Sequence, residues 1–165
     1  MKQFRTFLIA AVALLGFQTI NAQAKTAHVD VQEIMTKMPA VLDAQNQLKK
    51  LSDTYSAEYK TMVDEYQSKI KKYDAEAATV TDAVNQTRQT EMQDMGKRIG
   101  DYQETAQKDL QKKEADLMKP ITDKVKASIQ KVGKAKGFQY VFNAADLLLT
   151  DGPDITADVK KDLGF

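Results

Sequence analysis

The strongest constraint on this chain of 165 residues is a long series of apolar residues spaced three or four positions apart. Such spacing draws one apolar stripe along a helix, because an α-helix turns once in about 3.6 residues. The first series comprises Leu48, Leu51, Tyr55, Tyr59, Met62, Tyr66, Ile70, Tyr73, Ala77, Val80 and Val84. It predicts one long amphipathic helix with a narrow seam. Pro39 suits its first turn, where a missing N–H costs nothing.

A second series with the same spacing predicts a second long helix, which ends near Gly133 or Gly137. Its members are Met92, Met95, Ile99, Tyr102, Ala106, Leu110, Leu117, Ile121, Val125, Ile129 and Val132. Pro120 lies inside this series and predicts a kink or local break, because its ring clashes with the preceding turn. We interpret that position as a junction between a projecting arm and a packed base.

The turn between the two helices is expected within residues 79–90, TVTDAVNQTRQT, which contain neither Gly nor Pro. Thr90 with Gln93 has the spacing of a capping box. Two antiparallel helices of equal length would place the turn near residue 85, with arms of about 45 residues or roughly 65 Å each.

Short apolar segments at the two ends of the hairpin predict strands. Residues 26–32 alternate apolar and polar side chains, and residues 138–144 and 147–152 read as two further strands. Residues 154–165 predict a short helix capped by Asp154 or Thr156. Three short strands make a marginal sheet, so we expect an assembly platform completed by other copies of the chain. The residues assigned to this oligomerisation body are Val29, Val31, Phe138, Tyr140, Phe142, Leu147, Leu149, Ile155 and Val159.

Residues 1–24 have the build of a secretory signal peptide. Lys2 and Arg5 precede an apolar run over residues 7–17, and small residues follow at a cleavage position after Ala22 or Ala24. The apolar run has 11 residues, whereas a bilayer span needs roughly 20. We therefore expect an exported protein. The chain has no cysteine, which excludes cysteine-linked lipid, disulfides and thiolate metal sites.

Charge is balanced overall but uneven along the chain. Without the leader, 22 Lys and Arg face 23 Asp and Glu, so bulk attraction to nucleic acid is not expected. Residues 41–118 carry a net charge of −3, while residues 119–139 carry six Lys and one Asp. This basic collar fits either favourable lysine placement near a helix C-terminus or a binding role.

No catalytic or metal-binding pattern is present. His28 is the only histidine, and a single histidine does not make a metal site. The serines have no basic partner at a useful spacing, and no glycine-rich phosphate loop occurs. We therefore expect no enzyme, no cofactor and no metal.

Three motifs, in this order and spacing, resemble the Skp/OmpH family of periplasmic chaperones. They are AHVDVQEIM with Pro39 just after it, MKPITDKVKASIQKVGKAKGFQYVF, and the closing DITADVKKDL. The resemblance covers essentially the whole mature chain. It implies a homotrimer with a central barrel and projecting helical arms, which holds unfolded outer-membrane β-barrel proteins without ATP. Contact with membrane or lipopolysaccharide stays open, because the arms are near neutral.

The seam tyrosines and methionines support two interpretations, packing between the two helices or adaptable contact with unfolded clients at the edge of the seam. The candidate client-binding residues are Tyr55, Tyr59, Met62, Tyr66, Tyr73, Met92, Met95 and Tyr102. Gly96 and Gly100 each destabilise a helix by roughly 1 kcal/mol relative to Ala. They indicate either a close approach of the partner helix or, with Pro120, a hinge in the arm.

The predicted fold is α+β and mainly α. A helical-hairpin arm (39–119) projects from a β-rich body (25–38 and 120–165) that assembles into an oligomeric barrel. The predicted function is that of a periplasmic holdase. The alternative is a structural or adaptor coiled coil of the cell envelope that binds a single folded partner.

Overall fold

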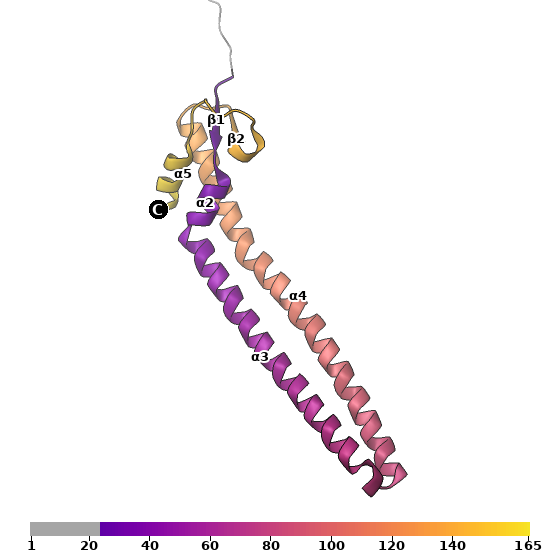
Figure 1. Ribbon diagram of the computed structural model, residues 1–165. Coiled ribbons are helices and arrows are strands. Elements are labelled where there is room, and N and C mark those ends of the chain that lie inside the picture. Colours follow the sequence, from indigo (N-terminus) through magenta and orange to yellow (C-terminus); the bar gives the residue numbers. More distant parts are fainter. Residues whose placement is uncertain (1–23) are drawn as a thin grey trace, which may run out of the picture.

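A computed structural model describes residues 24–165 as a long helical hairpin on a small body (Figure 1). The body begins with strand β1 (Thr26–Val29) and helix α2 (Val31–Lys37). The hairpin consists of α3 (Pro39–Glu76) and α4 (Asp82–Ala135), and the chain returns through β2 (Tyr140–Asn143) to α5 (Thr156–Leu163). Short 3-10 turns, η1 (Ala77–Thr79) and η2 (Ala144–Asp146), follow α3 and β2. The predicted mainly α fold with a projecting hairpin is confirmed.

Met38 separates the two N-terminal helices. It is the C-cap of α2, and its N–H donates to the carbonyl of Ile34 at 2.9 Å. Its backbone is extended, as expected for a residue before proline, and Pro39 then occupies the first turn of α3 as predicted. Because the Met38 side chain is buried in the body, the arm starts from a fixed point.

The turn at the tip of the arm lies at residues 77–81, at the early edge of the predicted range. Thr81 caps α4, and its hydroxyl accepts the N–H of Val84. Thr90 instead lies inside α4, where its hydroxyl donates to the carbonyl of Gln86 at 3.2 Å. The predicted midpoint near residue 85 and the capping box were wrong because the helices are unequal. α4 has 54 residues against 38 in α3, since α4 continues into the body.

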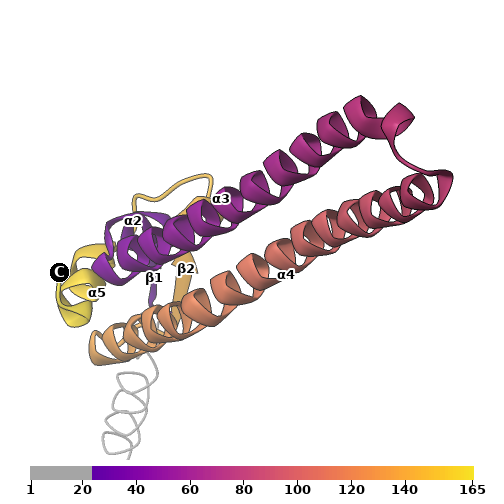
Figure 2. The same cartoon turned by 90° about the horizontal axis from the view of Figure 1, so that it is seen from below.

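Helix α4 runs through Pro120 without interruption, so the expected local break is absent. The proline is exposed, and so is Asp116, whose carbonyl loses its helical donor. Water can satisfy that carbonyl, which lowers the cost of a proline inside the helix. α4 is therefore one continuous rod that joins the arm to the body. Figure 2 shows α3 and α4 side by side from the body to the turn.

Two glycines shape the turn from α4 into β2. Gly137 has a φ of 75°, and the N–H groups of Gly137 and Phe138 donate to the carbonyls of Lys134 and Gly133 at 3.0 and 2.9 Å. This pair of bonds is a Schellman motif, which needs a left-handed residue. A Cβ on Gly133 would lie 3.0 Å from Cγ2 of Val141, so the glycine permits β2 to approach the helix closely.

The sheet differs from the predicted one. β1 pairs with β2 in parallel, with Ala27 opposite Val141. On the other side of β1, His28 donates its N–H to the carbonyl of Pro153 and accepts the N–H of Ile155, at 2.9 and 3.0 Å. β1 is therefore the central strand, and residues 147–152, predicted as a further strand, do not join the sheet within the described chain.

The predicted strand boundaries also need correction. β1 stops at Val29 because Asp30 caps α2, its carboxylate accepting the N–H of Glu33 at 2.7 Å. Val31 consequently starts a helix rather than continuing a strand. Residues 147–152 form no strand because, in this single chain, no neighbouring strand pairs with them.

One apolar cluster joins all the elements of the body. Its buried members come from β1, α2, the start of α3, the end of α4 and α5: Ala27, Val29, Ile34, Met38, Val41, Val125, Val132, Ile155 and Val159. The C-terminal segment packs one side on this cluster, since Ile155 and Val159 are buried and Leu163 packs against it. Strand β1 and helix α5 are thus both fixed to the base of the hairpin.

Candidate functional site

The seam of the arm is narrow and half-open. Between residues 45 and 119 only Met95 and Ala106 are buried. The other seam residues of α3 and α4 are mostly half-exposed. A helix pair packed this way leaves aromatic and sulfur-containing side chains partly in contact with solvent.

Two tyrosines tie the helices together near the middle of the arm. The rings of Tyr55 on α3 and Tyr102 on α4 pack edge to face, with centroids 6.0 Å apart. Each hydroxyl crosses to the other helix: Tyr55 donates to Asp109 at 3.1 Å and Tyr102 to Glu58 at 2.6 Å. Desolvation and the hydrogen bond to Glu58 raise the pKa of Tyr102 to about 12. Desolvation, followed by the bond to Asp109, also raises the pKa of Tyr55.

A cluster of polar and charged side chains links α3 to α4 near the tip of the arm. The Tyr73 hydroxyl donates to Glu91 at 2.6 Å, and Lys69 also pairs with Glu91. The guanidinium of Arg88 lies 4.4 Å from the centroid of the Tyr73 ring and pairs with Glu76. The hydrogen bonds from Lys69 and then Tyr73 lower the pKa of Glu91. This cluster joins the two helices by charge where apolar burial is small.

The candidate client-binding residues fall into two groups in the structure. Tyr55, Tyr73 and Tyr102 use their hydroxyls between the helices, and Met95 is buried, so these four take part in the seam. The other four, Tyr59, Met62, Tyr66 and Met92, are half-exposed along its edge. Client contact by either group stays a prediction.

A shallow groove of about 350 Å³ follows the middle of the arm. Aromatic rings and neutral polar side chains line it, among them Tyr59 and Tyr102 with Ser52, Ser56, Gln103 and Gln107. Its lining holds no charged side chain, although charged residues are frequent elsewhere on the arm. The groove is thus an uncharged stretch on an arm whose surface is otherwise rich in charge.

Gly96 and Gly100 do not mark a close approach of the helices. Both are exposed, and a Cβ added at either position would meet nothing within 4 Å. The close-approach interpretation was wrong, because α3 lies on the other side of α4 at this level. The hinge interpretation for Gly96, Gly100 and Pro120 stays a prediction.

The predicted oligomerisation residues are split between the core of this chain and its surface. Val29, Ile155 and Val159 are buried, Val31 and Phe138 pack against them, and Leu147 is half-buried. By contrast, Tyr140 is 57 % exposed, Phe142 46 % and Leu149 73 %. The Tyr140 and Phe142 rings stack with their centroids 6.4 Å apart. The body therefore displays an aromatic face on β2.

Leu148, absent from the predicted set, is fully exposed next to Leu149. The run of three leucines at residues 147–149 was the signal that could have identified it. Alternation along the assumed strand instead selected Leu147 and Leu149. The exposed apolar surface of the body is larger than predicted.

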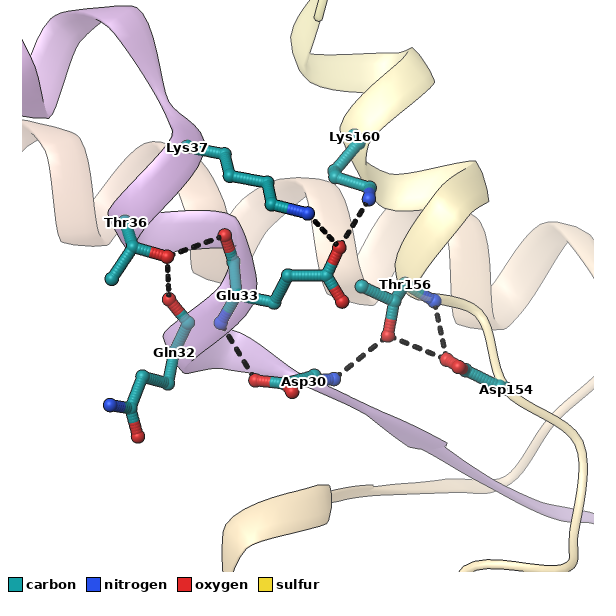
Figure 3. A network of polar contacts seen from close by, with 8 residues as sticks. All are labelled: Asp30, Gln32, Glu33, Thr36, Lys37, Asp154, Thr156 and Lys160. Carbon is teal, nitrogen blue, oxygen red and sulfur yellow. Dashed lines mark hydrogen bonds and ion pairs between the residues drawn. The ribbon is translucent and has the colours of Figure 1, made fainter.

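A polar network that the sequence did not indicate holds α5 against α2 (Figure 3). Lys37 and Lys160 both donate to Glu33, at 2.9 and 2.7 Å. These partners, Lys160 first, lower the pKa of Glu33 to about 2. Thr156 accepts the backbone N–H of Asp30 at 2.8 Å. Figure 3 shows these residues facing one another across the two helices.

Many polar groups of the body have structural partners. His28 is buried with Nε2 3.9 Å from the carboxylate of Asp154, beside the sheet. Residues 24–165 contain no group of three or more potential metal ligands. In the same range no helix is both long and apolar enough to cross a bilayer. The fold places the protein in the class of helical-arm proteins, in which a long helical hairpin projects from a small α/β base.

Comparisons with known proteins identify the family within this class. The family described as "Outer membrane protein (OmpH-like)" matches residues 25–163, so the chain belongs to the OmpH-like family. The "Chaperone protein Skp" of Photorhabdus luminescens is 25 % identical over 162 residues, covering 98 % of both chains. The crystal structure of an OmpH-like outer membrane chaperone from Caulobacter crescentus has a similar fold. Its TM-score is 0.78 at 16 % identity, over 86 % of this chain and 85 % of that one.

Proposed function

We propose that this protein is an ATP-independent holdase chaperone of the periplasm, and not an enzyme. The observation that carries the proposal is the half-open arm seam, where Tyr59, Met62, Tyr66 and Met92 stay half-exposed. Tyr59 also lines the uncharged groove. Flexible methionines and half-polar tyrosines suit contact with many different sequences. Membership of a family whose relatives are named as chaperones supports the same conclusion.

The proposed clients are unfolded outer-membrane β-barrel proteins, which the resemblance to the Skp/OmpH family implies. An unfolded chain presents many short segments, each of which binds a Tyr- and Met-lined surface weakly. Several arms around one client raise the effective concentration of each contact, so retention results from avidity. Nucleotide plays no part in this mode of binding.

The body is proposed to join copies of the chain into a homotrimer. The outer edge of β2 has no strand partner among the described residues, and Tyr140, Phe142, Leu148 and Leu149 are exposed near it. A two-stranded sheet is marginal alone and gains stability from further strands. Export would follow from the leader, residues 1–24, most of which lies outside the described part of the chain.

The proposal is tested by diluting an unfolded outer-membrane β-barrel protein from urea into the purified mature protein, without nucleotide. Light scattering should show a soluble complex of one client with about three chains of this protein. Client aggregation at every ratio would contradict the holdase proposal. It would favour an adaptor with one folded partner.

A matched pair of variants locates the contact on the arm. Tyr59→Ser with Tyr66→Ser removes two half-exposed rings and should weaken client retention several-fold. The control, Thr61→Ser with Gln67→Ser, changes two exposed residues on the same helix and should retain the client. Circular dichroism on both variants verifies that the arm stays helical. Equal retention by both would contradict a role for the tyrosine edge.

A further inference from the structure

The groove in the middle of the arm contrasts with the hollows nearer the tip. A hollow of about 810 Å³ lies along α4 near the tip, and five of its lining residues are charged: Glu91, Asp94, Lys97, Arg98 and Asp101. A smaller hollow of about 250 Å³ has Glu65 and Arg98 in its lining. The middle groove is lined by neutral side chains, although it lies on the same two helices. We call it the neutral groove.

Rings and aliphatic groups form the apolar part of the neutral groove. Tyr55 and Tyr59 of α3 and Tyr102 of α4 line it, together with the buried Ala106 and the half-buried Leu110. The hydroxyls of Tyr55 and Tyr102 donate to carboxylates of the opposite helix. Because these two hydroxyls are already bonded, both tyrosines offer a ligand mainly the surface of their rings.

Neutral hydrogen-bonding groups form the rest of the lining. They belong to Ser52, Ser56, Gln103 and Gln107. None of these four side chains forms a hydrogen bond with a residue of the described range 24–165. By contrast, the hydroxyl of Thr54, outside the groove, donates to the carbonyl of Lys50 in its own helix. The groove therefore presents uncharged donors and acceptors that the chain itself does not use.

Several charged residues beside the neutral groove are already paired. Lys49 binds Asp53 at 2.8 Å, and Lys108 pairs with Glu104. Glu58 accepts the hydroxyl of a groove tyrosine. A charged segment in the groove would lose part of its water without gaining an opposite charge from the lining.

We propose that the neutral groove binds a short, extended and uncharged segment of an unfolded client and excludes charged segments. Apolar side chains of the segment pack on the tyrosine rings and Leu110. The serine and glutamine side chains bond its main-chain N–H and C=O groups, which need partners when water is displaced. The inference rests on the proposed holdase function and names the kind of client segment that the arm selects.

The length of the groove fits about three client residues. On α3 it extends from Ser52 to Tyr59, which is seven positions or about 10 Å of helix rise. An extended chain advances about 3.3 Å per residue. Strands of transmembrane β-barrels contain suitable segments, because apolar side chains alternate in them with polar ones. An arm of a second copy is a poor fit, since charged residues occur along both of its helices.

Two short peptides with blocked ends test the preference for uncharged segments. Both alternate aromatic and polar residues, and the first has only threonine and glutamine at the polar positions. The second has one lysine and one glutamate at two of these positions, so both peptides have a net charge of zero. Fluorescence anisotropy with the purified protein should show about tenfold tighter binding of the first peptide. Equal affinities, or binding of neither peptide, would overturn the inference.

Charges placed in the groove test where the peptide binds. Ser56→Glu with Gln107→Glu should weaken binding of the uncharged peptide by about tenfold and strengthen binding of a peptide with two lysines. The control, Thr54→Glu with Thr105→Glu, adds the same charge on exposed residues outside the lining and should leave both affinities unchanged at physiological salt. Circular dichroism verifies that both variants stay helical. The same affinities in the two double variants would contradict binding in the groove.

Two other results are distinguishable from the proposed one. If an arm of a second copy occupied the groove, Ser56→Glu with Gln107→Glu would change the mass of the protein without client in analytical ultracentrifugation, which overturns the proposal. Failure of the holdase function would appear as aggregation of the full-length client with the unsubstituted protein. If that client is retained while the two peptides bind equally, the inference fails and the proposed function stands.

Discussion

The body and the arm are stabilised differently. The body gathers nine buried side chains from five elements around Ile34, Ile155 and Val159. Beyond Ala44 the arm buries only two more side chains up to residue 119, Met95 and Ala106, and it relies on bonds such as Tyr102 to Glu58. A weakly buried hairpin can change its separation at small cost, whereas a body with one core keeps its shape. The difference suits a firm base that carries adaptable arms.

The largest expected effect separates the two regions by stability. Ile155→Ala removes a fully buried side chain of the body and should lower the free energy of unfolding by about 2–5 kcal/mol. The matched change in the arm, Ile70→Ala, acts on a half-exposed residue and should cost about 1 kcal/mol. Urea titration followed by circular dichroism measures both. Equal losses would break the comparison.

The arm glycines provide the next effect, with the opposite sign. Gly96→Ala and Gly100→Ala meet no neighbour within 4 Å and should each stabilise the arm by up to about 1 kcal/mol. If these glycines form a hinge, the double variant should also hold a narrower size range of clients. Thermal melts and client-retention assays measure the two consequences. If the double variant holds the same size range of clients, the hinge interpretation is wrong. The expected gain in stability does not depend on that result.

The tyrosine bonds give a smaller loss. Tyr102→Phe keeps the ring contact with Tyr55 and removes the hydroxyl that donates to Glu58. Glu58 is exposed and can bind water instead, so the cost should be about 0.5 kcal/mol. The control Tyr59→Phe changes a hydroxyl that has no hydrogen bond with a described residue, and should change stability less. An equal and negligible loss for both variants would mean that the rings, which both variants keep, rather than the hydroxyl bonds hold the arm together.

The smallest expected effect is the pH dependence of stability, which should differ between the arm and the body. The pKa of Tyr102 is raised to about 12, so its stabilising contribution is complete below pH 10 and is lost as the pH rises toward 12. The pKa of Glu33 is lowered to about 2, so its contribution is complete above pH 4.5 and is lost as the pH falls toward 2. Alkali should therefore loosen the middle of the arm and acid the contact between α5 and α2. Tyr102→Phe and Glu33→Gln should each abolish the corresponding dependence in melting curves; a persistent one would assign it to other groups.

Sequence periodicity predicted the arm well because its helices repeat one local pattern. The tip was placed too late because helices of equal length were assumed. No local pattern indicates that α4 has 54 residues against 38 in α3. The sheet was harder to predict. The parallel pairing of Ala27 with Val141, and the contact of Lys160 with Glu33 across 127 positions, depend on how the ends of the hairpin meet. Local patterns carry no information on such contacts.

Local sequence patterns were also insufficient to predict how the candidate binding residues are used. Spacing selected the seam tyrosines but not which hydroxyls would be used between the helices. Tyr55 and Tyr102 find carboxylates on the opposite helix, whereas Tyr59 has a similar position in the pattern and stays at the edge. Likewise, alternation selected Leu147 and missed the fully exposed Leu148, because the assumed strand does not form in the single chain.

Hydrogen exchange of the assembled protein, with and without an unfolded outer-membrane client, tests the division between arm and body most directly. In the free protein, amides of β1, α2 and α5 should exchange more slowly than those of α3 and α4 between residues 45 and 119. Added client should protect the arm and leave the body unchanged. Protection confined to the body, with the arm unaffected, would contradict the account.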